Sequence, residues 1–206
     1  MFQRRFLFVA VSAAAIAIIG LLVVLALNNS GNKSQVTTVI TGAQIGGPFT
    51  LTNHQGSAVT EQDFKGKYML IYFGFTYCPD VCPTSLQDMT TALEEMGSDA
   101  DAITPVFITV DPERDTVEAV AEYMEAFHPR MVGLTGSVSD TSKAAKAYRV
   151  YYARIDAEEG RPENEYLMDH SSYFYLVGPG GTFQDAFQSK MAIDQLIQKL
   201  KARISS

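Results

Sequence analysis

The chain of 206 residues contains only two cysteines and three histidines, and fewer basic than acidic residues. A small secreted fold held together by disulfides would spread four or more cysteines along the chain, whereas both cysteines here stand in one short motif. Long polar tracts and internal repeats are also missing, which excludes a disordered, collagen-like or coiled-coil protein. These absences indicate a globular domain whose two thiols are functional.

Positive charge is scarce beyond the N-terminus. All 23 acidic residues but only 14 of the 16 basic ones follow residue 27, so this part carries a formal charge of −9. Such a balance argues against nucleic acid as a partner. It suits a basic protein partner or a cation, although solubility alone would also explain it.

One long hydrophobic run stands near the N-terminus. Residues 6–27 carry no charge, follow Arg4 and Arg5, and are long enough to cross a bilayer. We therefore expect a cytoplasmic N-terminus at 1–5, a single transmembrane helix at 6–27, a linker at 28–47 and an exported domain at 48–206. A cleaved signal peptide is the alternative, although its apolar core is usually about 7 to 15 residues long. Because no transit-peptide pattern precedes the run, we expect a bacterial inner-membrane protein with its domain in the periplasm.

Strand and helix patterns alternate along the rest of the chain. A hairpin is expected at 48–60, and strands are expected at 67–75, 103–110, 131–134, 150–155, 172–177 and 183–187. Helices are expected at 80–96, 116–127, 141–148 and 192–204. This order predicts an α/β fold built as a three-layer sandwich.

The two cysteines lie in the motif CPDVCP at residues 78–83, where a buried strand passes into a helix. Asp80 is placed to cap that helix, and Pro83 falls in its first turn. A helix N-terminus lowers the pKa of nearby thiols, so Cys78 and Cys82 are expected to be reactive. Two thiolates at this spacing suit a soft ion such as Cu(I) or zinc. A structural disulfide is the alternative, although closing so short a loop stabilises a fold little.

A third ligand would have to be a histidine. His54 falls in the hairpin turn and His128 at a helix end, where surface or capping roles are expected. His170 precedes the strand 172–177, in the loop that faces the cysteines of thioredoxin-type folds. That loop usually carries a proline, but the nearest prolines here are Pro162 and Pro179. The position of His170 in the sequence is compatible with a purely structural role. A histidine where a redox enzyme would carry proline favours a metal ligand instead.

Four motifs together resemble the SCO/SenC family, the copper-binding assembly factors of cytochrome c oxidase. They stand at residues 78–83, 111–116, 133–136 and 169–172. The resemblance implies a thioredoxin-like fold in which Cys78, Cys82 and His170 bind one copper ion, as Cu(I) or Cu(II). It further implies a metallochaperone that supplies the dinuclear copper centre of cytochrome c oxidase subunit II. Another copper chaperone and a thioredoxin-like reductant are further expected partners.

Two acidic residues in these motifs allow local interpretations. Asp169 is expected either to orient a neighbouring ligand or to be a solvated surface group. Asp115, with Glu118 three residues later, is expected to form a capping box at the start of the helix 116–127.

A second function is compatible with the same cysteine pair. As a thiol–disulfide reductase, the protein would cycle Cys78 and Cys82 to keep a recipient's copper-ligand cysteines reduced. That activity does not need His170, which separates it from copper delivery. A peroxidase would rest on analogy of fold alone.

Overall fold

The computed structural model describes residues 45–157 and 162–205, which belong to one compact unit, Ala43–Ser206. The expected segments 1–5 and 6–27 lie outside the described residues, as does the linker apart from residues 45–47. In the described part of the chain, no helix combines the length and the hydropathy that a membrane crossing requires.

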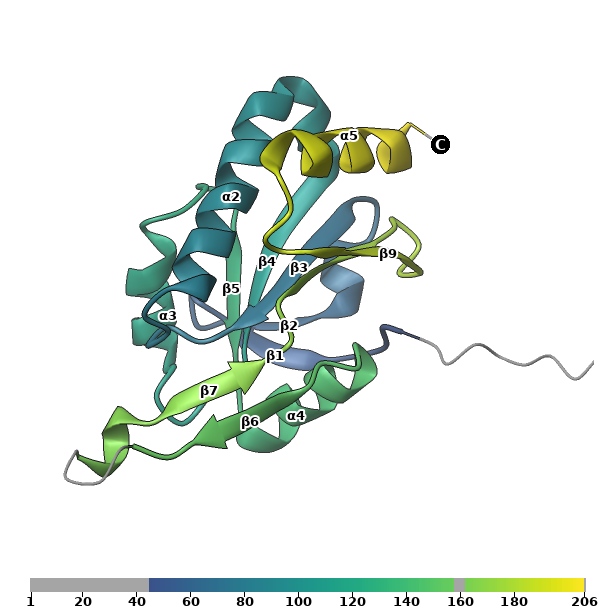
Figure 1. Ribbon diagram of the computed structural model, residues 1–206. Helices are drawn as coiled ribbons and strands as arrows, with labels where there is room; N and C mark the ends of the chain where they lie inside the picture. Colours follow the sequence, from purple (N-terminus) through teal and green to yellow (C-terminus); the bar gives the residue numbers. More distant parts are fainter. Residues whose placement is uncertain (1–44, 158–161, 206) are drawn as a thin grey trace, which may run out of the picture. The chain divides into compact units, whose positions relative to one another are not determined.

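A seven-stranded mixed sheet forms the middle layer, in the order β2-β1-β5-β4-β3-β8-β9 (Figure 1). Its central strands β3, β4 and β5 run parallel, while β8 pairs with β3 in the antiparallel sense. The strands of this sheet are β1 (Thr50–Asn53), β2 (Ala58–Thr60), β3 (Tyr68–Gly74), β4 (Ile103–Thr109), β5 (Val132–Thr135), β8 (Tyr173–Val177) and β9 (Phe183–Gln188). β3 and β4 are buried almost throughout, as their continuous apolar sequences require.

Helices lie on both faces of this sheet. They are α2 (Val81–Met96), α3 (Val117–Met124), α4 (Val138–Ala147) and α5 (Ile193–Ile204), with short 3-10 helices η1 (Glu61–Phe64), η2 (Gly97–Ala102) and η3 (Glu163–Glu165). Successive side chains of β3 point to opposite faces. Gly74 approaches Cys82 of α2 on one face, whereas the ring of Phe73 packs on Tyr148, just after α4, on the other. The predicted α/β sandwich is therefore confirmed.

Close packing of α3 on β5 explains one of the four motifs. A Cβ atom at Gly133 would lie 2.5 Å from Cγ1 of Val120 and 2.8 Å from Cγ of Met124. Because protein interiors are densely packed, any larger residue at position 133 would push the helix away from the sheet.

The order of the elements agrees with the prediction, but two elements differ. α4 begins at Val138 instead of residue 141, because the Ser137 hydroxyl accepts a hydrogen bond from the Asp140 amide and caps the helix. The expected strand 150–155 becomes β6 (Tyr152–Ile155), which does not join the main sheet. It pairs instead with an unpredicted strand, β7 (Leu167–His170).

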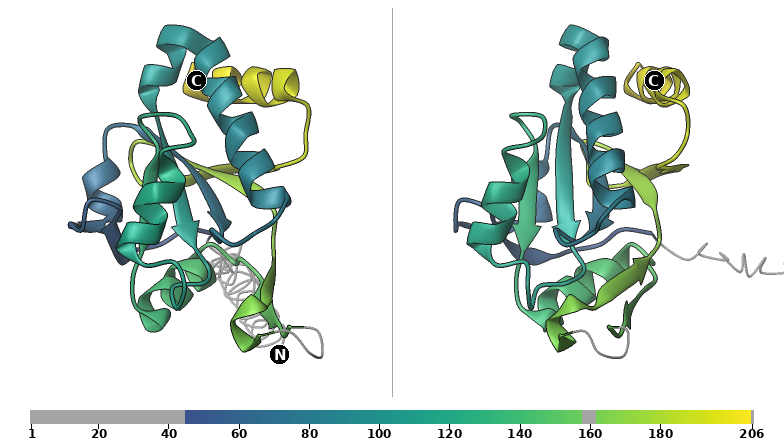
Figure 2. Two further views of the ribbon diagram at one scale, coloured as in Figure 1. Left: turned by 90° about the vertical axis from the view of Figure 1, so that its left-hand side faces the viewer. Right: turned by 60° about the vertical axis from the view of Figure 1, so that its left-hand side comes forward.

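The β6–β7 hairpin lies below the ends of the central strands and is drawn in green in Figure 2. His170 is the last residue of β7 and pairs with Tyr152. It therefore ends a strand, whereas the sequence analysis placed it in a loop. The hairpin carries this side chain toward the edge of the sheet where β3 passes into α2.

Candidate metal centre

The junction between β3 and α2 holds both cysteines. Cys82 lies in the first turn of α2, and Cys78 lies in the loop before it. Cys82 is fully buried, Cys78 is 9% exposed, and both are free thiols. The backbone amide of Cys82 donates a hydrogen bond to Sγ of Cys78 at 3.3 Å. The first turn of the helix thus stabilises negative charge on Cys78.

The two thiols have very different acidities. Hydrogen bonding from the Cys82 thiol lowers the pKa of Cys78 to about 4, and the amides of Asp80 and Cys82 act in the same direction, against the effect of burial. Hydrogen bonding to the Cys78 sulfur, reinforced by burial, raises the pKa of Cys82. The pair therefore holds one proton near neutral pH, and that proton has to leave when an ion binds both sulfurs.

Asp80 does not act as predicted. It occupies the N-cap position of α2, but its side chain makes no capping hydrogen bond. The amide of Cys82 donates to Sγ of Cys78 instead, which keeps the positive end of the helix available to the thiolate.

His170 faces the thiols with one ring nitrogen. Its Nε2 lies 3.3 Å from Sγ of Cys82, and its Nδ1 lies 3.2 Å from the carbonyl oxygen of Ser171. A carbonyl oxygen can only accept, so the Ser171 contact holds the proton on Nδ1. The lone pair of Nε2 is then directed at the cysteines, which is the tautomer that a metal ligand needs.

Two aromatic rings fix the plane of the imidazole. The rings of Tyr72 and Phe75 each lie 6.0 Å from the His170 ring, at interplanar angles of 81° and 90°. Edge-to-face contacts of this kind restrict rotation of the imidazole ring. His170 is therefore held in position before any ion binds.

The donor set fits a soft metal ion. With bond lengths of about 2.3 Å to sulfur and about 2.0 Å to nitrogen, the 3.3 Å separation between Cys82 and His170 corresponds to an angle of about 100° at a shared ion. Thiolate and imidazole ligands favour copper or zinc over hard cations. Across residues 45–157 and 162–205, no three Cys, His, Asp or Glu side chains already form a closed metal site.

The other histidines serve local structure, as predicted. Nδ1 of His54 accepts a hydrogen bond from the amide of Gly133, and Nδ1 of His128 accepts one from the amide of Arg130. Asp169 is exposed, and its side chain has no hydrogen bond or ion pair within the described residues. The described residues therefore favour the solvated-surface interpretation of Asp169 over the ligand-orienting one.

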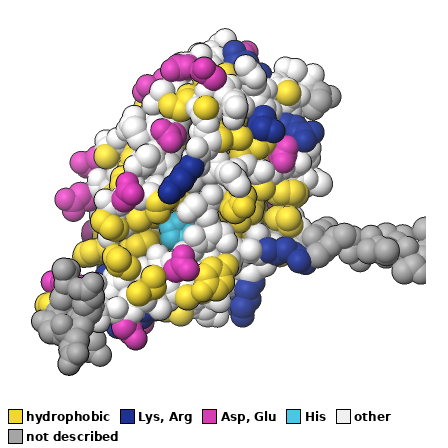
Figure 3. All heavy atoms as spheres, viewed as in Figure 1, with side chains coloured by type: hydrophobic (Ala, Val, Ile, Leu, Met, Phe, Trp, Pro, Cys, Tyr) yellow, Lys and Arg dark blue, Asp and Glu magenta, His cyan; other side chains and the backbone are white. Residues whose placement is uncertain are grey.

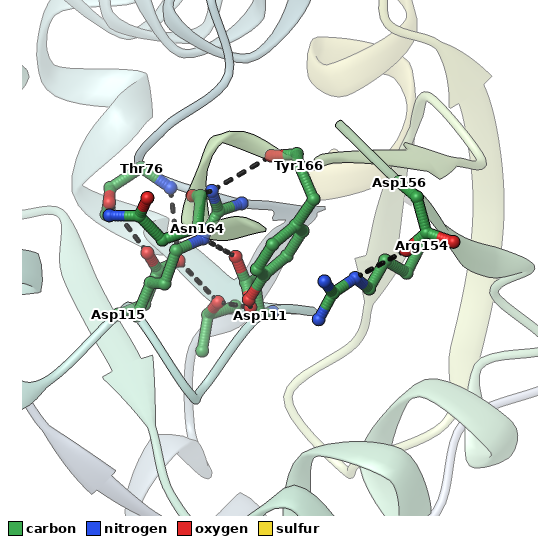
Figure 4. Close-up of polar contacts among 9 residues, drawn as sticks. Thr76, Asp111, Asp115, Arg154, Asp156, Asn164 and Tyr166 are labelled. Carbon is green, nitrogen blue, oxygen red and sulfur yellow. Dashed lines mark hydrogen bonds and ion pairs between the residues drawn. The ribbon is translucent and has the colours of Figure 1, made fainter. Parts of the chain in front are cut away.

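Asp115 has a different role from the predicted capping box. It is fully buried and accepts hydrogen bonds from the amide and hydroxyl of Thr76, at 3.0 and 2.6 Å, and from the hydroxyl of Thr109 at 2.5 Å (Figure 4). The N-cap of α3 is Thr116, whose hydroxyl accepts from the amide of Ala119. Asp115 thus ties the loop before Cys78 to the end of β4.

Three residues that we call the Arg114 clamp, Asp111, Arg114 and Tyr166, attach the segment before β7 to the loop after β4. Nε of Arg114 donates to Asp111 at 2.6 Å, and its terminal nitrogen donates to the carbonyls of Asn164 and Tyr166, both at 2.9 Å. The guanidinium lies 3.6 Å from the centre of the Tyr166 ring, and the Tyr166 hydroxyl donates to Asp111 at 2.6 Å. The motif at 111–116 signalled this site, but nothing in the sequence identified Tyr166 as its partner.

Replacing Arg114 tests the clamp. The side chains of Arg114 and Asp111 are only 12% and 3% exposed, so Arg114→Met leaves a buried carboxylate without its cation. We expect the free energy of unfolding to fall by about 3 kcal/mol in urea titrations. In Arg154→Met, the lost side chain also lies over the Tyr166 ring but is 41% exposed, and the change should stay within about 0.5 kcal/mol. Equal losses in the two variants would contradict the clamp.

The fold and the site together define a class of protein: a thioredoxin-like α/β domain with two thiols at a helix start and an imidazole facing them. The sequence profile of the SCO1/SenC family matches residues 37–205. The chain therefore belongs to the SCO1/SenC family, and the resemblance seen in its motifs is confirmed.

Individual relatives support this assignment. A human mitochondrial protein named SCO1 homolog is 47% identical over 145 residues, which cover 69% of this chain and 47% of the relative; the chain spans about half of that protein's length. The copper-bound structure of ScoI from Bradyrhizobium japonicum is 42% identical, with a TM-score of 0.69 over 77% of this chain and 98% of that one. The structure of BsSco, described as having a disulfide switch and as a member of the Sco family of cytochrome c oxidase assembly proteins, is 25% identical. Its TM-score is 0.61 over 79% of this chain and 95% of that one.

These relatives contradict the expected bacterial inner-membrane location. Several curated relatives, the human one among them, are described as mitochondrial. The expectation rested on the missing transit-peptide pattern before residue 6, and those residues lie outside the described part of the chain. The absence of a transit-peptide pattern was too weak a signal to decide the compartment.

Proposed function

We propose that this protein binds one copper ion through Cys78, Cys82 and His170 and delivers it during assembly of cytochrome c oxidase. The recipient in this proposal is the dinuclear copper centre of subunit II. The observation that carries the proposal is the approach of His170 Nε2 to within 3.3 Å of Cys82 Sγ, with Nδ1 turned to the Ser171 carbonyl. A redox pair alone has no use for an imidazole held in this tautomer.

The chemistry of the relatives agrees with copper as the ion. ScoI from Bradyrhizobium japonicum has been solved with copper bound, and BsSco is described among the assembly proteins of cytochrome c oxidase. Two thiolates and one neutral imidazole suit Cu(I) and also accept Cu(II). A site with three protein ligands leaves room for a ligand from a partner, so copper can pass by ligand exchange.

The surroundings of His170 allow a partner to approach. A hollow of about 430 Å³ lies beside it, lined among others by Val81, Met168 and Lys190. Leu167 and Tyr173, which flank the histidine in sequence, are 42% and 38% exposed. In Figure 3 one histidine reaches this face of the molecule, with hydrophobic side chains nearby and a basic and an acidic side chain beside it. Exposed apolar groups around a reactive site favour contact with another protein.

Thiol–disulfide reduction is the second candidate, and one observation favours it. The amide of Cys82 contacts Sγ of Cys78, and the low pKa of Cys78 makes its thiolate available to attack a disulfide. In this function the chain's dithiol reduces a disulfide between the recipient's copper-ligand cysteines and is itself oxidised to a disulfide. A thioredoxin-like reductant would then restore the dithiol.

A transfer experiment separates the two functions. The full-length chain, either copper-loaded or metal-free and reduced, is mixed with the soluble copper domain of subunit II, whose cysteines start either reduced or oxidised. Copper delivery predicts that the reduced recipient gains copper from the wild type and gains much less from His170→Ala. If both proteins reduce the oxidised recipient equally well and neither transfers copper, the reductase function replaces delivery.

A further inference from the structure

Tyr72 carries a buried hydroxyl for which the fold provides no partner. It lies in the middle of β3, and its side chain is fully buried. Within the described residues its hydroxyl oxygen makes no hydrogen bond. Buried polar groups are nearly always paired, so an unpaired hydroxyl in this position calls for a reason.

The hydroxyl is surrounded by groups of the metal centre. The polar side chains near this hydroxyl are those of Ser85, Ser172 and Cys82. None of them forms a hydrogen bond with it in the described part of the chain. The Tyr72 ring also packs edge-on against His170 at 6.0 Å. Tyr72 therefore adjoins two of the three proposed copper ligands.

Gly74 provides the space in which the Tyr72 ring and the Cys82 sulfur approach each other. A Cβ atom at position 74 would lie 2.9 Å from Sγ of Cys82 and 3.0 Å from Cε1 of Tyr72. Any side chain there would push the two apart. A tyrosine hydroxyl keeps its proton at neutral pH, so Tyr72 can act as a donor.

We propose that the Tyr72 hydroxyl donates a hydrogen bond to the Cys82 sulfur when that sulfur binds copper as a thiolate. The inference rests on the proposed function. A protonated thiol is a weak acceptor, whereas a thiolate accepts strongly, and copper displaces the thiol proton when it binds. The hydroxyl is thus unpaired in the metal-free protein because its acceptor forms only on metal binding.

This hydrogen bond has a defined electronic effect. It withdraws electron density from the sulfur and so stabilises Cu(I), the more electron-rich state, relative to Cu(II). Tyr72→Phe should therefore reduce the preference for Cu(I) over Cu(II) by about tenfold, which lowers the one-electron reduction potential by about 59 mV. The thiolate-to-copper absorption band should also move to lower energy. Tyr72 acts here as a positioning residue, because it touches the ligand and not the ion.

The experiment compares three full-length proteins: wild type, Tyr72→Phe and Tyr123→Phe. Tyr123 is the matched control, because its buried hydroxyl is also unpaired but lies in α3. For each protein we would measure copper stoichiometry, the reduction potential, and the melting temperature with and without copper. We expect one copper per chain in all three, a lower potential and a smaller copper-induced rise in melting temperature only in Tyr72→Phe, and no loss of metal-free stability in that variant.

Each other outcome overturns the proposal in a recognisable way. One copper per chain with unchanged potential in Tyr72→Phe overturns the hydrogen bond and leaves the copper function standing. An equal fall in potential in Tyr123→Phe shows a general effect of the core. A lower metal-free melting temperature in Tyr72→Phe shows that the hydroxyl already has a partner. Failure of the wild type to bind copper overturns the proposed function and this inference together.

Discussion

Oxidation of Cys78 and Cys82 to a disulfide is expected to abolish copper binding by this protein. Disulfide sulfur is no longer a thiolate donor, so two of the three proposed ligands disappear at once. The full-length chain would be oxidised completely, freed of excess reagent and incubated with copper. Copper content, with a thiol assay on the same sample, should fall from one ion per chain to none.

Re-reduction is the control for this experiment. If the loss of binding comes from the disulfide alone, a dithiol reductant followed by desalting restores one copper per chain. Undiminished copper content after complete oxidation would show that the ion is held elsewhere. Loss that reduction does not reverse would point to damage of the fold and would contradict a simple thiol switch.

Replacement of His170 by alanine is expected to weaken copper binding by about 100-fold. Loss of a neighbour that only orients a ligand typically costs about 10- to 100-fold in metal affinity, and loss of a ligand reaches at least the upper end of that range. The measurement is competition against a Cu(I) chelator, with the full-length chain kept reduced. His128→Ala is the matched control, because the ring of this half-buried histidine accepts a hydrogen bond from the amide of Arg130, and the variant should bind copper like the wild type.

The tautomer of His170 gives this prediction its physical basis. The Ser171 carbonyl holds the proton on Nδ1, so Nε2 offers a lone pair to the site without first losing a proton. Alanine removes that nitrogen donor, so the copper ion would be bound by the two sulfurs alone. Equal affinity in His170→Ala and the wild type would remove His170 from the site and leave the thiol reductase as the better account of the cysteines.

The central fold was predictable because its signals are local and strong. The apolar runs of β3 and β4 predict strands buried on both faces. The helical spacing of apolar residues after residue 80 predicts α2. The β6–β7 hairpin was only half predicted. Its strands have four residues each, and exposed Ile155 and Leu167 blur the pattern of a strand with one buried face.

The thiols and the histidine were predictable from their motifs, but their supporting contacts were not. Arg114 donates to Tyr166, 52 residues further along the chain, and Asp115 accepts from Thr76, 39 residues before it. Such pairs depend on how loops meet at the edge of the sheet, which no periodicity encodes. Asp115 and Glu118 also have the spacing of a capping box, so the sequence pattern predicted a capping role for Asp115, whose carboxylate is in fact buried.

The most direct test of the central claim is X-ray absorption at the copper edge, on the reduced full-length chain loaded with one equivalent of Cu(I). Two sulfur ligands and one nitrogen ligand are expected, and His170→Ala should lose only the nitrogen contribution. Sulfur ligation alone in the wild type, or nitrogen and oxygen ligation without sulfur, would contradict a site made by Cys78, Cys82 and His170.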